Sequence, residues 1–112
     1  MSTRIHKKLH FMPNLVDKVL NGSKTSTWRL WDDKDLQVGD IVDFLETGTE
    51  RLFATVQLEK VIERKLGKLT KEEMEGHEAY QSQNELYKKF SEYYKKPVDG
   101  NTVVKIIWFK LQ

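Results

Sequence analysis

A run of nine residues near the carboxyl end, Val103–Leu111, limits the possible folds more than any other stretch of the sequence. Only Lys105 and Lys110 interrupt its apolar character. Branched and aromatic side chains of this kind favour a β-strand. A continuous apolar strand, without alternation, is typical of burial on both faces. We therefore expect a sheet that is covered on both sides at this strand.

Alternating apolar and polar residues predict further strands earlier in the chain. In the first of them, Leu9 and Phe11 lie on one side and His10 lies on the other. Residues 46–50 contain Gly48 and predict a hairpin loop between two of the strands. The predicted strands cover residues 5–11, 24–28, 41–45 and 52–62, the last being long.

Helices are predicted in two parts of the chain. Pro13 and Asn14 open a short amphipathic helix, and Gly22 ends it, because glycine accepts the left-handed conformation. Two capping boxes, each a hydroxyl residue followed three positions later by glutamate, predict helices in the second half. The capping-box pairs are Thr70 with Glu73 and Ser82 with Glu85. The second pair precedes an apolar stripe at helical spacing, formed by Leu86, Phe90 and Tyr93 or Tyr94.

This order of elements predicts an α+β fold rather than a doubly wound sheet. Five to six short, mostly antiparallel strands with two to three flanking helices suit a small closed or half-closed barrel, because closure hides the sheet edges. The length of 112 residues predicts one domain, residues 1–112. The expected core residues are Leu9, Val19, Val42, Phe44, Val56, Leu86, Phe90, Ile106 and Trp108.

The absence of cysteine excludes disulfides, thiol catalysis and cysteine-ligated zinc. No apolar run approaches the roughly 20 residues that a membrane-spanning helix needs. We therefore expect a cytoplasmic protein without a membrane partner. The net charge of +2 does not by itself predict nucleic-acid binding. A local basic cluster is compatible with RNA binding or with an ordinary solvated face. It consists of Lys60, Arg64, Lys65, Lys68 and Lys71.

The chemically richest stretch, GSKTSTWR at residues 22–29, directly follows the first predicted helix. A desolvated Lys24 could lose its proton and activate the hydroxyl of Thr27. It could also be a cation that binds a phosphate or a carbonyl, or it could satisfy free carbonyls at the helix end. Thr27 could equally be an ordinary strand residue, and Arg29 could pair with a carboxylate for structural reasons.

Lys24 and Thr27 can meet only if the backbone bends between them. In a regular strand, residues three apart point to opposite faces. Gly22 and the change from helix to strand make a bend reasonable. Thr27 and Arg29 share a face of the strand without a bend.

The pattern Gly-x-Lys-x-x-Thr-x-Arg at residues 22–29 resembles the signature of the ASCH domain family. Residues 36–40, LQVGD, resemble the turn that precedes the next strand in that family. Glu75 and Gly76, followed by residues 82–94, resemble its acidic-glycine step and helix, and residues 103–109 resemble its closing strand. The resemblance covers nearly the whole chain in the right order and implies a PUA-like fold.

The resemblance also implies a cleft between barrel and helices. Related single-domain bacterial members hydrolyse the amide of acylated cytosine nucleosides with a lysine, a threonine and a glutamate. Carried over by position, these are Lys24, Thr27 and Glu75, with Glu78 as the second choice for the acid. Glu75 would orient Lys24 or carry a proton. Glu75 could also be solvated surface.

Substrate contacts are expected from Arg29, Trp31, Glu78 and Tyr80. Tryptophan is more often a core residue than a stacking surface. Trp31, in a predicted loop beside three aspartates, is the best candidate for stacking on a base, ahead of Trp28 and Trp108. His6 and His10 would lie about 13 Å apart on a strand, too far to share one ion. No metal or cofactor is therefore expected.

Two functions from different classes follow. The first is a small amidohydrolase that acts on acylated cytosine nucleosides of the N(4)-acetylcytidine type. The second is a non-catalytic RNA-binding or adaptor module that uses the same basic cleft. The Lys24 and Thr27 pair favours the enzyme, whereas the basic cluster favours RNA as the partner. The oligomeric state is not predicted by the sequence.

Overall fold

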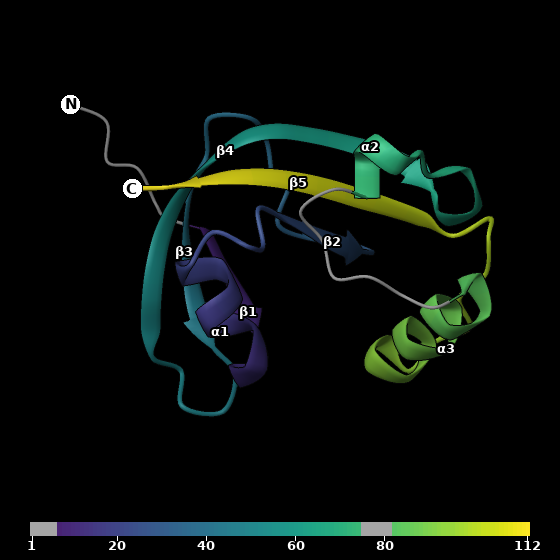
Figure 1. The fold of residues 1–112 in the computed structure, drawn as a ribbon, viewed down its shortest axis with the longest axis horizontal. Coiled ribbons are helices and arrows are strands. Elements are labelled where there is room, and N and C mark those ends of the chain that lie inside the picture. Colours follow the sequence, from purple (N-terminus) through teal and green to yellow (C-terminus); the bar gives the residue numbers. More distant parts are fainter. Residues whose placement is uncertain (1–6, 75–81) are drawn as a thin grey trace.

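The computed structural model describes residues 7–74 and 82–112 (Figure 1). Five strands and three α-helices lie within these ranges. The strands are β1 (Lys7–Phe11), β2 (Ser26–Leu30), β3 (Ile41–Glu46), β4 (Leu52–Lys65) and β5 (Val103–Leu111). The helices are α1 (Pro13–Leu20), α2 (Lys71–Met74) and α3 (Gln83–Tyr94), and a 3₁₀ turn, η1 (Leu66–Lys68), follows β4. None of the described helices is long and apolar enough to cross a bilayer.

The strands form one mixed sheet in the order β1-β3-β4-β5-β2. β1 and β3 are parallel, and the other three neighbouring pairs are antiparallel. The predicted α+β class with a mostly antiparallel, PUA-like half-barrel is confirmed. β4 pairs with β3 over residues 52–57 and with β5 over residues 56–65, and its register with β5 shifts between Leu58 and Lys60.

The side chain of Arg29 connects the two edges of the half-barrel. β1 and β2 are the two edges of the sheet, and no ladder joins them. Nη2 of Arg29 on β2 donates a hydrogen bond to the carbonyl oxygen of His10 on β1, at 3.0 Å. The Arg29 guanidinium also lies over the ring of Phe11, 4.9 Å from its centroid. Arg29 thus spans the seam and gives a partner to a carbonyl of an edge strand.

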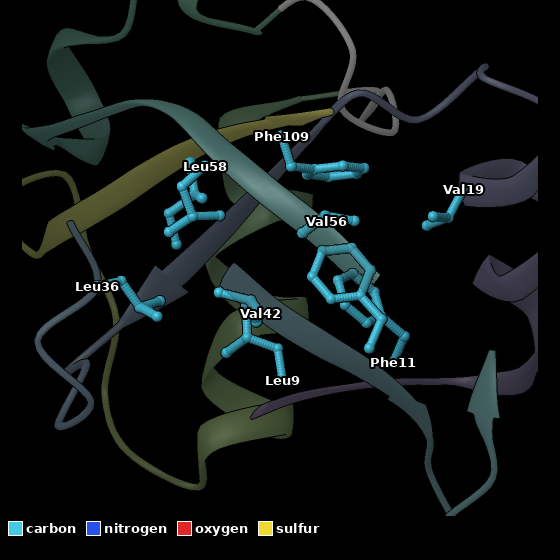
Figure 2. Close-up of a cluster of buried hydrophobic side chains, with 10 residues drawn as sticks. Leu9, Phe11, Val19, Leu36, Val42, Val56, Leu58 and Phe109 are labelled. Atoms are coloured by element: carbon cyan, nitrogen blue, oxygen red, sulfur yellow. The ribbon is translucent and has the colours of Figure 1, made fainter. Parts of the chain in front are cut away.

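The inner side of the curved sheet holds the first of two hydrophobic clusters, here called the barrel core (Figure 2). Phe44 packs ring against ring with Phe11 and Phe109 there, at centroid distances of 4.4 Å and 4.9 Å. The loop after β2 contributes Leu36, and α1 contributes Val19. The members are Leu9, Phe11, Val19, Leu36, Val42, Phe44, Val56, Leu58, Ile107 and Phe109.

The second cluster, here called the helix-side core, lies between the sheet and α3. Its members are Trp28, Leu30, Leu66, Leu86, Phe90, Val98, Val104 and Ile106. β5 supplies both clusters: Ile107 and Phe109 point into the barrel core, whereas Val104 and Ile106 point into the helix-side core. The predicted burial of this strand on both faces is therefore confirmed, because the barrel core covers one face and the helix-side core covers the other.

The expected core is found except for one residue. Trp108 is only partly buried, and Lys60 lies over its ring at 5.0 Å. Trp108 packs against the helix-side core but is not enclosed by it. The prediction of full core burial was wrong for this residue, because Lys60 rather than an apolar side chain lies over its ring.

Local signals in the sequence placed most element ends correctly. The capping boxes are present: Thr70 Oγ1 accepts from the Glu73 N–H, and Ser82 Oγ accepts from the Glu85 N–H. Gly39, with φ of +90°, makes the turn that leads into β3. The prediction that the second strand begins at Lys24 was wrong, since β2 begins at Ser26. The shift of two residues matters for the site.

Candidate functional site

The segment between α1 and β2 places Lys24 at the edge of the barrel. Gly22 has a φ of +84°, so the chain turns sharply after α1. The N–H of Ser23 donates to Oδ1 of Asn21, and the N–H of Lys24 donates to the carbonyl of Lys18, each at 2.9 Å. These bonds hold the chain against the end of α1 before the strand begins.

Lys24, Ser26 and Thr27 are the buried polar residues among those that the structure describes, at 3%, 0% and 4% exposure. Thr25 is anchored to β5, because its carbonyl accepts from the N–H of Phe109 at 3.2 Å. The side-chain alternation of β2 starts only at Ser26, so it does not govern Lys24. Lys24 and Thr27 line the same cavity.

This cavity has a volume of about 200 Å³ and opens along the seam between β1 and β2. One wall comes from the end of β1 and from α1, and includes Phe11, Met12 and Leu15. The opposite wall comes from α3. The middle is formed by Lys24, Thr27, Trp28 and Arg29. Such a space suits one ring system better than a drug-sized ligand, for which pockets of roughly 300–1,000 Å³ are typical.

Aromatic side chains form the α3 wall. Phe90 and Tyr94 stack on each other, and Phe90 stacks on Trp28, with centroids 6.1 Å and 6.3 Å apart. The hydroxyl of Tyr94 accepts a hydrogen bond from the Leu30 N–H at 3.0 Å, so α3 also satisfies the edge of β2. Burial raises the pKa of Tyr94 above its usual value, so the phenol stays protonated at neutral pH.

Lys24, Thr27 and Arg29 therefore lie together, whereas Trp31 does not line this cavity. Trp31 is 48% exposed and lies outside this cavity. Glu75, Glu78 and Tyr80 lie outside the described residues. No group of three or more histidine, aspartate or glutamate side chains that could hold a metal occurs within residues 7–74 and 82–112.

No protein-family model and no curated protein matches the sequence. Solved structures do. A DUF984 protein from Enterococcus faecalis V583 matches with a TM-score of 0.78 and 16% identity, over 97% of this chain and 82% of that one. The ASCH domain from Lactobacillus crispatus JV V101 matches with a TM-score of 0.71 and 12% identity, over 95% and 79%. The ASCH protein from Zymomonas mobilis matches with a TM-score of 0.65 and 12% identity, over 92% and 65%.

This chain has the ASCH-domain fold. The resemblance drawn from residues 22–29 is thereby confirmed at the level of the fold. In this fold, residues 22–29 contain the glycine turn that follows α1 and the residues in the middle of the cavity. They also contain Arg29, which bonds to β1 across the seam.

The sequence did not single out the α3 wall or the α1 wall of the ASCH cavity. In the sequence, Phe90 and Tyr93 form part of an apolar helical stripe, and Met12 carries no motif. The aromatic content of the stripe is the available signal, since Phe90, Tyr93 and Tyr94 bring three rings to one end of a helix.

The basic cluster of residues 60–71 lies away from the cavity. Arg64 forms a hydrogen-bonded ion pair with Glu73 at 2.8 Å, and Lys60 covers Trp108. The cations that line the cavity are Lys24, Arg29 and Lys89. Charge at the candidate site therefore comes from residues other than those of the cluster.

Proposed function

We propose that this protein hydrolyses the exocyclic amide of acylated cytosine nucleosides in the cavity between β2 and α3. One observation carries the proposal: Lys24 and Thr27, an amine and a hydroxyl, are both buried and line one cavity. The ASCH fold supports it, and residues 22–29 resemble the family signature, whose lysine and threonine fall on Lys24 and Thr27.

The proposed chemistry uses Thr27 as the nucleophile. Its Oγ1 attacks the acyl carbonyl carbon while Nζ of Lys24, in its neutral form, takes the hydroxyl proton. Collapse of the tetrahedral intermediate breaks the C–N bond, and the proton passes to the departing amino group of cytosine. Water then hydrolyses the acyl ester on Thr27. Glu75 is proposed to orient Lys24.

The walls of the cavity suit the nucleobase. Aromatic rings on the α3 side offer faces for stacking, and Met12 and Leu15 offer apolar contact opposite them. Desolvation in such surroundings favours the neutral form of an amine, which is the form that a general base needs. A small cavity favours a single-ring pyrimidine.

The test is incubation with N(4)-acetylcytidine, followed by chromatography for cytidine. Release of cytidine by the wild type, and its loss in Thr27→Ala, is the expected result. If Lys24 is the base, turnover rises with pH through the ionisation of its amine. No release of cytidine from any acylated cytosine nucleoside would contradict the proposal.

A binding module remains the second candidate, and three cations along the cavity favour it. Lys24→Arg separates the two candidates. Arginine keeps its proton at any working pH, so it cannot act as the base. The substitution is expected to remove hydrolysis, whereas RNA binding through a plain cation would survive it and would weaken steeply with added salt.

A further inference from the structure

An exposed aromatic surface adjoins the cavity at the carboxyl end of α3. Trp31 and Tyr93 are 48% and 54% exposed. Both pack edge-to-face against Tyr94, with centroid distances of 5.5 Å and 5.0 Å. Tyr93 and Tyr94 also line the cavity, so the surface continues into it. We call these three residues the aromatic platform.

The backbone at Trp31 is held in an unfavourable conformation. Its φ is +50°, in the left-handed region that bulky residues rarely adopt. Glycine would take this conformation without penalty. The packing of Trp31 against Tyr94 does not require exposure of the indole, yet almost half of the residue remains in water. Strain at an exposed aromatic residue beside a cavity points to a use outside folding.

Positive charge lies next to the rings. Nζ of Lys96 is 4.7 Å from the centroid of the Trp31 ring, and Lys89 lies on the cavity wall. The carboxylate of Asp32, adjacent to the platform in sequence, is held by Lys105 at 2.8 Å. Exposed Glu92 reduces the positive charge near the helix end, so the stacking surfaces are the main attraction and the lysines add a weaker one.

We propose that the aromatic platform binds the nucleotide next to the reacting base, so that the protein takes short single-stranded oligonucleotides in addition to free nucleosides. The inference rests on the proposed function, because it takes the cavity as the place of the reacting base. Exposed aromatic rings with neighbouring lysines are the means by which proteins bind single strands with little sequence preference. The flanking base stacks on Tyr93 or on the face of Trp31 opposite Lys96, and Lys96 binds the phosphate.

Fluorescence anisotropy with a fluorescein-labelled cytidine hexanucleotide tests the platform. Trp31→Ala and Tyr93→Ala are each expected to raise the Kd about tenfold, since stacking on one aromatic residue is worth about 1–3 kcal/mol per base. Lys96→Ala is expected to lower the salt dependence of binding. Leu52→Ala and Lys110→Ala are the matched controls, because both residues are exposed and neither lines the cavity, so neither should change the Kd.

Trp31→Gly separates binding from folding. It removes the ring and relieves the backbone, so it is expected to weaken hexanucleotide binding as much as Trp31→Ala while the melting temperature changes little. Equal Kd values for the wild type and both ring variants would overturn the proposal. So would sedimentation showing that the wild type self-associates through Trp31, since the platform would then be a protein interface.

The hexanucleotide carries no acyl group, so its binding is measured whether or not the protein hydrolyses anything. Hydrolysis of free N(4)-acetylcytidine without platform-dependent binding overturns this inference and leaves the proposed function in place. Platform-dependent binding without hydrolysis supports the platform and contradicts the proposed function. The two failures are therefore distinguishable.

Discussion

The two faces of β5 pack against different kinds of surroundings. Ile107 and Phe109 enter the barrel core, which strands, α1 and the loop after β2 enclose and which contains only aliphatic and phenyl side chains. Val104 and Ile106 enter the helix-side core, where Trp28 and Phe90 continue into a cavity. The candidate site lies where the two cores meet, with Phe11 of the barrel core on one side and Trp28 and Phe90 of the helix-side core on the other.

The largest expected effect is on turnover at the candidate site, which lies at the border between the two cores. Thr27→Ala and Lys24→Ala are each expected to reduce turnover of N(4)-acetylcytidine by about 10²–10⁴-fold, as is usual when a general acid–base group is removed. Circular dichroism should show an unchanged fold. Wild-type turnover in either variant would show that the residue has a structural role alone. The border between the two cores would then have no catalytic function that depends on it.

Removal of a ring from each core measures the packing difference directly. Phe44→Ala should cost about 3–5 kcal/mol, because the ring is 0% exposed and contacts three other rings. Phe90→Ala should cost about 2–3 kcal/mol, because one side of that ring already borders the cavity. Urea denaturation of the two variants gives both values. A larger loss for Phe90 would show that the helix-side core is the better packed.

Asp32, in the loop that contains Leu36, forms an ion pair with Lys105 of β5. This ion pair makes the attachment of the loop to the sheet sensitive to pH. Burial raises the pKa of Asp32, but the Lys105 ammonium and the N–H groups of Lys34 and Leu36 outweigh it, so the pKa lies below its ordinary value of 3.8. A carboxyl with a lowered pKa in the folded state stabilises the protein above its ordinary pKa. That contribution is lost as the pH falls through the folded-state value.

Asp32→Asn is therefore expected to lower the free energy of unfolding by about 1 kcal/mol at pH 6, since hydrogen bonds to a partly buried charge are lost. The difference from the wild type should shrink as the pH falls below about 4. Denaturation curves for both proteins at several pH values provide the measurement. A difference that stays constant down to pH 3 would show that the charge of Asp32 does not hold the loop.

The smallest expected effect is on stability at Trp31. Trp31→Gly relieves a left-handed backbone worth about 1 kcal/mol and loses a contact with Tyr94 of similar size, so the net change should be within about 0.5 kcal/mol. Thermal unfolding measures it, with Trp31→Ala as the variant that loses the contact but keeps the strain. If both variants lose stability equally, the backbone is not strained there.

The sequence by itself determined the elements and their order, because each signal for them is local. Alternation predicted β3 and most of β4, two capping boxes predicted the starts of α2 and α3, and the unbroken run Val103–Leu111 predicted a strand covered on both faces. The motif at residues 22–29 likewise carried Lys24 and Thr27, since eight neighbouring residues suffice to recognise it.

Only the tertiary structure decided which side chains surround the motif. Whether Lys24 and Thr27 share a cavity depended on a two-residue shift in the start of β2, which Gly22 and the contact with Lys18 set. The wall formed by Phe90 and Tyr94 comes from more than 60 positions away in the chain. Arg29 reaches His10 because the sheet curves until its two edges face each other. Contacts across such distances depend on the closure of the whole sheet, which local patterns do not record.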